Sequence, residues 1–159
     1  MLKVGDFFLC GNSGGVMGAV VPHGKGCMGV APAHIFRLAG TSQLRIGNQK
    51  AKVSHFSPTT DLAYFPLLAA SQPSVLEKPK LGEASLENAA RKMDCTVSNV
   101  SWSVVYVVLQ PRNLPGPGDG GTPLIQEGKV KGMLLSINLG TCRGIVVSSE
   151  IIKSEAPKS

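Results

Sequence analysis

The chain has 159 residues, a length that suits one compact domain or two small subdomains sharing a core. A hydrophobic fraction of 43% excludes a disordered protein, and 19 glycines with 11 prolines favour many turns over long helices. The formal charge of +6 is scattered along the chain, and two Tyr with one Trp offer little surface for base stacking, so no nucleic-acid partner is required.

Both halves of the chain consist of short apolar or β-branched runs separated by turn residues. The first half has breaks at Gly-Asn-Ser-Gly-Gly, His-Gly-Lys-Gly and Ser-Pro-Thr-Thr, and the second half repeats this style. Such spacing favours antiparallel barrels. The expected strands are residues 6–10, 14–22, 26–34, 42–47, 50–56 and 61–67, then 95–111, 121–127, 129–138 and 142–149.

A more charged segment with two prolines separates the halves, and its end, residues 85–92, favours a helical turn or two. We therefore expect the following organisation. Residues 1–70 form an N-terminal barrel, 71–92 the connection, 93–152 a C-terminal barrel and 153–159 a flexible tail.

Four cysteines, Cys10, Cys27, Cys95 and Cys142, form no Cys-x-x-Cys pair and show no close Cys/His spacing. The sequence therefore predicts neither a disulfide framework nor a metal site, and no cofactor. Reduced thiols favour a reducing, cytoplasmic compartment. No stretch approaches the roughly 18 apolar residues that span a bilayer, and the first apolar run is too short for a secretory signal, so we expect a soluble protein or a soluble piece of a longer one.

Three short segments contain candidate catalytic residues. His34 follows Ala-Pro-Ala, Asp61 opens an apolar run, and Gly120 lies in a Gly-Asp-Gly-Gly turn. Each has a structural alternative, because a lone histidine often packs in a core, an aspartate often caps a turn, and the glycine run can be a hairpin loop. Their order, however, is that of base, orienting acid and nucleophile in chymotrypsin-type enzymes.

These segments resemble the chymotrypsin-like serine peptidases, especially the compact ones of positive-strand RNA viruses such as arteriviruses, astroviruses and hepaciviruses. In that family the nucleophile lies in Gly-Asp-Ser-Gly-x-Pro, whereas residues 118–123 read Gly-Asp-Gly-Gly-Thr-Pro. The glycine-rich run before His34 and the strands after residue 131 extend the resemblance over most of residues 11–150. The resemblance implies an all-β fold of two antiparallel six-stranded barrels.

The resemblance also implies a role for each matching residue. His34 is the general base, Asp61 orients it, and Gly120 occupies the nucleophile position. The N–H groups of Gly118 and Gly120 form the oxyanion hole, and Asp119 braces their turn. An apolar strand at residues 132–136 implies an uncharged P1 side chain. The substrate-binding residues are Thr122, Leu134, Leu135 and Ser136.

Other candidate nucleophiles and ligands fit less well. Ser13 precedes His34, whereas the nucleophile of chymotrypsin-type enzymes follows the base. Ser13 is better interpreted as part of a turn into the first strand. Cys142 follows a turn and is expected to be a small buried hydrophobic residue. His23 and His55 have no partners recognisable in the sequence.

Glycine has no side chain to form an acyl-enzyme, so the protein as given is predicted to be inactive. The first functional hypothesis is a viral polyprotein-processing endopeptidase whose substrate is a peptide or polyprotein and whose nucleophile is missing. The second is a natural pseudopeptidase that binds a peptide or protein in the same cleft. A quality-control protease of the HtrA type is disfavoured, because no export signal or PDZ-like extension is present. The sequence leaves open whether Gly120 is natural or introduced, and the oligomeric state.

Overall fold

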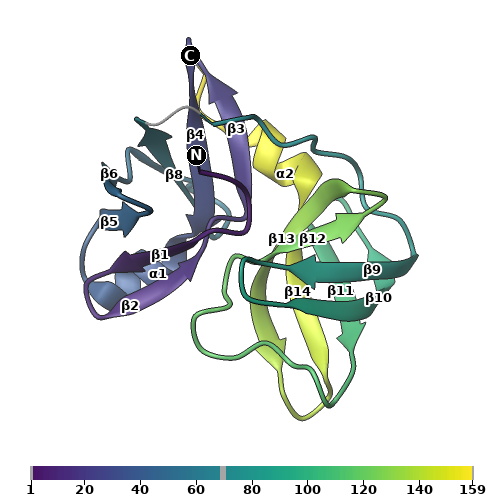
Figure 1. The fold of residues 1–159 in the computed structure, drawn as a ribbon. Helices are drawn as coiled ribbons and strands as arrows, with labels where there is room; N and C mark the ends of the chain where they lie inside the picture. Colours follow the sequence, from purple (N-terminus) through teal and green to yellow (C-terminus); the bar gives the residue numbers. More distant parts are fainter. Residues whose placement is uncertain (1, 69–70, 159) are drawn as a thin grey trace.

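The computed structural model describes residues 2–68 and 71–158 and consists mainly of β-strands in two halves (Figure 1). Strands β1 to β8 with helix α1 form the N-terminal half, and β9 to β14 form the C-terminal half, followed by helix α2. The elements are β1 Phe7–Cys10, β2 Ser13–Val16, β3 Ala19–His23, β4 Gly26–Pro32, α1 Ala33–Ala39, β5 Gln43–Ile46, β6 Gln49–Lys52, β7 His55–Phe56, β8 Leu62–Leu67, β9 Gly82–Glu87, β10 Lys92–Val100, β11 Val104–Leu109, β12 Pro123–Gln126, β13 Lys129–Asn138, β14 Arg143–Ser148 and α2 Ser149–Ser154.

The C-terminal half is a closed six-stranded barrel with the strand order β10-β11-β14-β13-β12-β9. All of its ladders are antiparallel. From Lys92 to Val97 of β10 and along β11 every second residue is buried, which is the period expected when one face of a strand lines a core. The barrel core comprises Leu86, Met93, Cys95, Val97, Val105, Val107, Leu109, Leu124, Leu134 and Val146.

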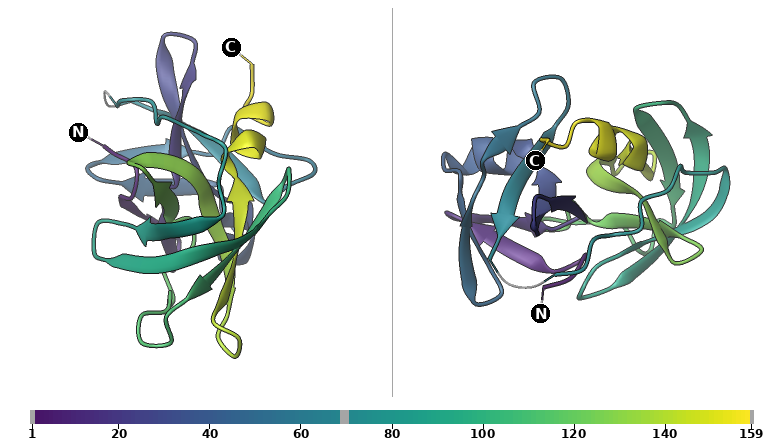
Figure 2. Two further views of the ribbon diagram at one scale, coloured as in Figure 1. Left: turned by 90° about the vertical axis from the view of Figure 1, so that its right-hand side faces the viewer. Right: turned by 90° about the horizontal axis from the view of Figure 1, so that it is seen from above.

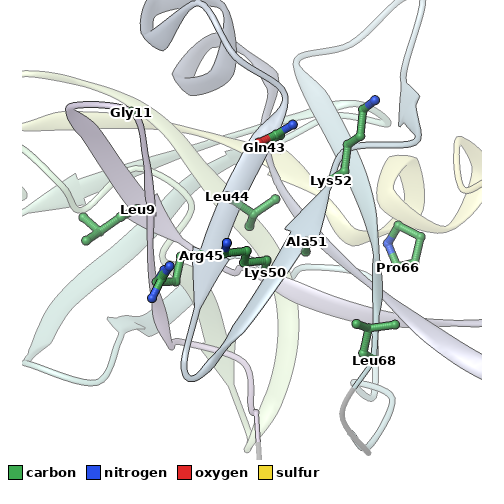
Figure 3. A pocket seen from close by; sticks show the side chains of 10 residues that line it. All are labelled: Leu9, Gly11, Gln43, Leu44, Arg45, Lys50, Ala51, Lys52, Pro66 and Leu68. Carbon is green, nitrogen blue, oxygen red and sulfur yellow. The ribbon is translucent and has the colours of Figure 1, made fainter.

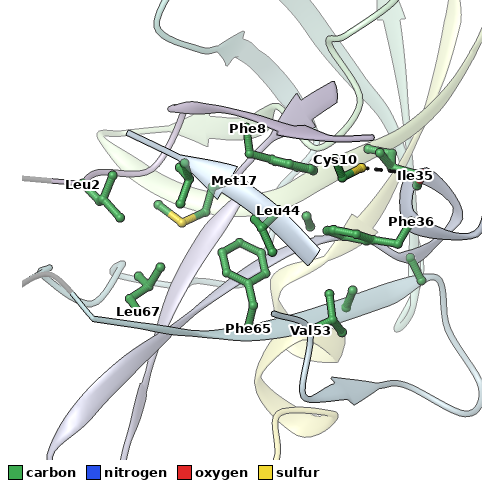
Figure 4. Packing of buried hydrophobic residues seen from close by; sticks show 14 of the residues in the cluster. Leu2, Phe8, Cys10, Met17, Ile35, Phe36, Leu44, Val53, Phe65 and Leu67 are labelled. Atoms are coloured by element: carbon green, nitrogen blue, oxygen red, sulfur yellow. Dashed lines mark hydrogen bonds between the residues drawn. The ribbon is translucent and has the colours of Figure 1, made fainter. Parts of the chain in front are cut away.

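The N-terminal half packs two four-stranded sheets, β2-β1-β5-β6 and β3-β4-β8-β7, over a shared core. Phe8 of the first sheet stacks on Phe36 of α1, with ring centroids 5.4 Å apart, and also contacts Phe65 of the second sheet (Figure 4). The all-β double-barrel fold predicted from the sequence is thus confirmed. In this half, however, the strands form two hydrogen-bonded sheets rather than one closed six-stranded ladder.

The expected boundaries of the connection are wrong at its C-terminal end. β9 begins at Gly82, within the predicted connection 71–92, and pairs with both β10 and β12 in the closed barrel. Residues 85–92 form no helix but the end of β9, a turn and the start of β10. Burial of Leu86 in the barrel core and pairing on both edges of β9 outweigh the local helical propensity of this segment.

The predicted flexible tail 153–159 is also partly wrong, because α2 continues to Ser154 and packs over the junction of the two halves (Figure 2). The Ser148 side chain caps α2 by accepting a hydrogen bond from Glu150 N at 3.2 Å. Tyr64 of β8 donates its hydroxyl to Ile152 O at 2.8 Å. α2 therefore joins the C-terminal barrel to the N-terminal half.

Candidate active site

Pairing of β4 with β8 brings His34 to Asp61. The two strands are antiparallel, and Pro32 lies opposite Leu62. His34 follows Pro32 in the first turn of α1, and Asp61 immediately precedes Leu62, so the same end of the ladder presents both residues. Ala33 N also donates to Asp61 O at 3.2 Å. The register of β4 and β8 thus brings together two residues that lie far apart in the sequence.

The Asp61 carboxylate holds His34 at two points. Oδ1 accepts a hydrogen bond from His34 N at 2.7 Å, and Oδ2 lies 2.5 Å from His34 Nδ1. Pro32, the residue at the N-cap of α1, makes no side-chain cap, so Asp61 satisfies a free N–H of the helix instead. Burial raises the pKa of Asp61, but hydrogen bonds and charge from His34 outweigh it, and the pKa lies below its ordinary value.

An ionised carboxylate only accepts hydrogen bonds, so His34 Nδ1 carries the proton of this pair. The second ring nitrogen, Nε2, is then the basic atom available to a nucleophile. The His34 side chain is 40% exposed, which leaves the ring accessible. A histidine held in this way by a carboxylate can act as a general base.

The turn at Gly120 is hydrogen-bonded to both halves of the molecule. Gly120 O accepts a hydrogen bond from Val16 N of β2 at 2.8 Å, and Gly121 N donates to Leu134 O of β13 at 2.8 Å. The C-terminal barrel thereby supplies the turn, and a strand of the N-terminal half fixes its position.

Neighbouring glycines in this turn have different conformational requirements. Gly121 has φ +97°, and a Cβ there would lie 2.1 Å from Val16 O, so only glycine fits. Gly120 has no positive φ, and its Cβ would meet only Ile35 Cδ1, at 3.5 Å, which is ordinary van der Waals contact. Position 120 therefore accepts a side chain without backbone strain.

Two backbone amides of the turn are available to a ligand. Within residues 2–68 and 71–158, the N–H groups of Gly118 and Gly120 donate to no protein acceptor. Gly118 has φ +89°, a conformation that favours glycine. Amides left free in a glycine-rich turn can bind a developing oxyanion.

His34, Gly118 and Gly120 line one cavity of about 270 Å³. Ser13 lies in its lining as well, at the start of β2. Apart from His34, the described residues of this lining carry no ionisable side chain. The remaining lining residues are Gly14, Ile35, Leu38, Pro115, Gly116, Pro117, Leu134, Leu135, Ser136 and Ile137.

Three of the four predicted substrate-binding residues also line this cavity, namely Leu134, Leu135 and Ser136 of β13. The ladder between β13 and β14 shifts register between Leu134 and Ser136, leaving Leu135 without a partner. Leu134 is 2% exposed and packs in the barrel core, whereas Ser136 is exposed. Thr122 is fully buried outside this lining, where its hydroxyl donates to Asp119 O at 2.7 Å. The structure thus places Thr122 in the support of the turn.

Sequence reasoning assigned Asp119 to the brace of the turn but missed its partners. The Asp119 carboxylate accepts hydrogen bonds from Arg91 and Asn88, which lie in the turn between β9 and β10. A buried carboxylate requires a partner of this kind. An aspartate expected to brace a turn therefore indicates that a hydrogen-bonding or cationic partner lies nearby. Only the folded barrel identifies which one.

A larger hollow, of about 750 Å³, lies on the N-terminal half and contains none of the three positions His34, Asp61 and Gly120 (Figure 3). Its lining comes mainly from β5, β6 and the end of β8. Among residues 2–68 and 71–158, no three His, Cys, Asp or Glu side chains gather to hold a metal ion. Nor does any helix of the described chain have the length and apolarity needed to cross a membrane.

His23 and His55 lie outside the cavity but do have neighbours. His23 Nδ1 lies 3.3 Å from Pro157 O, and the His55 ring packs against Tyr64 at a centroid distance of 5.7 Å. All four cysteines are unpaired thiols, of which Cys10 and Cys95 are buried.

No protein-family model matches the chain, and no curated protein matches it by sequence. Solved structures match it in fold. A glutamic-acid-specific serine protease, which uses a histidine triad in substrate binding, is similar with a TM-score of 0.75 at 14% identity, over 96% of this chain and 95% of its own. The NSP4 proteinase of equine arteritis virus has a TM-score of 0.60 at 20% identity, over 91% and 72% of the two chains. The serine protease of a human pathogenic astrovirus has a TM-score of 0.62 at 15% identity, over 93% and 91%. The chain thus has the fold of chymotrypsin-like serine proteases.

Proposed function

We propose that this chain is a serine endopeptidase domain whose nucleophile position is occupied by Gly120, so that the protein as given does not hydrolyse peptides. One observation carries the proposal: His34, whose Nδ1 lies against the Asp61 carboxylate, lines the same cavity as Gly118 and Gly120 with their free amides. A base with its orienting acid and an oxyanion hole are the parts that acyl transfer requires besides the nucleophile. Only the attacking oxygen is absent.

The geometry of position 120 supports this assignment. The neighbouring Gly121 permits no side chain, but a Cβ at position 120 meets only one methyl group at an acceptable distance. A serine would therefore add its hydroxyl to the cavity that His34 lines, without rearranging the turn. The base and the oxyanion donors would then have a group to act on.

The first test is Gly120→Ser. We expect the variant to cleave members of a peptide library, whereas the parent shows no turnover, because acyl transfer needs the serine oxygen. Gly120→Ala is the matched control, since it adds the Cβ without the oxygen. Adding Asp61→Asn to Gly120→Ser should lower kcat by about 10⁴-fold, because the asparagine favours the wrong histidine tautomer.

Adding His34→Ala to Gly120→Ser should abolish cleavage, because triad members act as a unit. Circular dichroism verifies folding of every variant. A well-folded Gly120→Ser protein that cleaves nothing would favour the alternative, a natural pseudopeptidase that binds a peptide or protein in this cavity. Cleavage by the unmodified protein would place the nucleophile elsewhere.

The second test concerns the substrate. Among the described residues of the cavity lining only His34 is ionisable, and an unpaired charge is costly to bury against apolar walls. We expect the active variant to select an uncharged, small or apolar P1 residue, in contrast to the similar protease that is specific for glutamic acid. Profiling cleavage with a peptide library measures this preference, and dominance of Glu, Lys or Arg at P1 would contradict it.

We further propose that the substrate is a viral polyprotein and that the domain acts in a reducing compartment, the host cytoplasm. Two considerations support this. Two of the proteins of similar fold are viral proteases, and the four cysteines are unpaired. Neither a cofactor nor a nucleic acid has a role in this chemistry.

A further inference from the structure

The larger hollow on the N-terminal half, about 750 Å³ in volume, combines cations with apolar side chains (Figure 3). Its cations are Arg45, Lys50 and Lys52, and all three are exposed. Leu9 and Leu68, which are 65% and 83% exposed, add apolar surface. Among the described residues, no Asp or Glu lines this surface, and none of its lining residues lines the candidate active-site cavity. We call it the basic hollow.

The strand register places these side chains in rows on the outer face of one sheet. Arg45 of β5 lies opposite Leu9 of β1 on one side and opposite Lys50 of β6 on the other. Gln43 and Lys52 form a further pair of the same ladder. Residues two apart on a strand point to the same face, so Lys52 lies on the same side as Lys50. The sheet therefore presents three cations beside an exposed leucine.

This arrangement of cations costs stability. Like charges directly opposite each other in an antiparallel ladder repel, and Arg45 and Lys50 form such a pair. Every ion pair that Lys or Arg makes within residues 2–68 and 71–158 joins residues beyond position 76, so no carboxylate of the described chain relieves this repulsion. An anion supplied by another molecule would relieve it.

The N-terminal half has no spare carboxylate for the basic hollow. Residues 1–68 contain six Lys or Arg and two Asp. Asp61 holds the His34 ring, and Asp6 Oδ2 accepts a hydrogen bond from Lys3 N at 2.9 Å. Neither aspartate lines the basic hollow. A ligand that complements this surface must therefore bring both negative charge and apolar groups.

We propose that the basic hollow binds an acidic peptide segment of a partner protein, with the carboxylates of the segment over Arg45, Lys50 and Lys52. Apolar side chains of the same segment contact Leu9 and Leu68. The described lining has no aromatic ring on which a base could stack, which disfavours single-stranded RNA. A recessed surface also suits a peptide better than a flat lipid surface. The inference uses no catalytic group, so it is independent of the proposed function.

Binding of a defined probe to the protein as given tests the proposal. The probe is a fluorescein-labelled eight-residue peptide in which Glu alternates with Leu, and fluorescence anisotropy measures its Kd. Binding should weaken by about tenfold or more between about 0.1 M and about 1 M NaCl, because the Debye length falls from about 10 Å to about 3 Å. A peptide of alternating Lys and Leu should not bind. A Kd of the acidic probe above about 1 mM at the lower salt would overturn the proposal.

Lys50→Glu separates binding from folding. It converts the repulsive pair with Arg45 into an attractive one, so the urea midpoint should rise while the Kd of the acidic probe increases by about tenfold or more. Lys25→Glu is the matched control, since Lys25 is an exposed lysine in the turn between β3 and β4, outside the hollow. It makes the same change in net charge and should alter the Kd by less than about twofold, because distant charges are screened. A Lys50→Glu protein that binds the probe as tightly as the parent would overturn the proposal.

Leu9→Ser tests the apolar contact. It should raise the Kd of the probe by about fivefold, as partial burial of a leucine implies. Leu139→Ser is the matched control, because Leu139 is 63% exposed and lies in the turn between β13 and β14. An unchanged Kd in Leu9→Ser would mean that the hollow attracts anions by charge alone, which contradicts a peptide site. Tighter binding of a uridine oligonucleotide or of phosphatidylserine vesicles than of the probe would likewise contradict it.

Discussion

At the scale of single residues, substitutions at the adjacent Gly120 and Gly121 should have different effects on stability. Gly121→Ala should lower the free energy of unfolding by about 2–4 kcal/mol, because its Cβ overlaps Val16 O at a positive φ. Gly120→Ala should be neutral or stabilise by up to about 1 kcal/mol, since alanine restricts the unfolded chain. Urea denaturation followed by circular dichroism measures both. Equal midpoints for the two variants would contradict this account of the turn.

Asp61 should make stability depend on pH. Its pKa is lowered in the folded protein, so its contribution is present above the unfolded pKa of about 3.9 and is lost as pH falls through the folded value. At neutral pH, Asp61→Asn should destabilise by about 1 kcal/mol, because bonds to a charged acceptor become bonds to a neutral one.

The difference in melting temperature between the parent and Asp61→Asn should therefore shrink as the pH is lowered below about 4. Asp94→Asn, which removes an exposed carboxylate on β10, is the control for the change in net charge. A difference that stays constant from pH 7 to acid would show that the Asp61 carboxylate is not stabilised by His34.

At the scale of elements, α2 is a short helix with a structural task. Ile152 is fully buried in a cluster that includes Val30 and Tyr64 of the N-terminal half and Met133 of the C-terminal barrel. Ile152→Ala should cost about 2–5 kcal/mol through lost burial and a cavity. Lys153→Ala is the control, because its ion pair with Glu150 is partly exposed to solvent and contributes little. Chemical denaturation measures both, and similar stabilities would mean that α2 does not join the halves.

Another element, β13, shows that the bounds of a strand can be predicted from the sequence while its register cannot. The expected strand 129–138 coincides with β13, Lys129–Asn138, because its apolar run and flanking turns are local signals. The register shift at Leu135 was not predicted. A bulge depends on how the partner strand β14 is positioned, which the sequence of β13 alone does not encode.

At the scale of the whole molecule, the candidate site exists only because the two halves pack together. Gly18 lies at their contact, where a Cβ would be 2.3 Å from Gly121 O and 2.4 Å from Met133 Cγ. This approach, with the bond from Val16 N to Gly120 O, sets the turn against the half that carries His34. The chemistry of the site is therefore a property of the junction, and small residues at the junction make it possible.

The sequence by itself determined the β-rich architecture, the order of His34, Asp61 and the glycine turn, and the absence of a hydroxyl at position 120. These features are written in local patterns of burial, turn residues and residue identity. Tertiary structure decided the rest. Residues 85–92 form a strand and a turn because β10 and β12 pair with β9, and residues 149–154 form a packed helix because a buried cluster accepts Ile152. Arg91 meets Asp119 only because β9 lies beside β12 in the closed barrel. Contacts between residues far apart in the chain depend on how the strands assemble, and no local pattern records that arrangement.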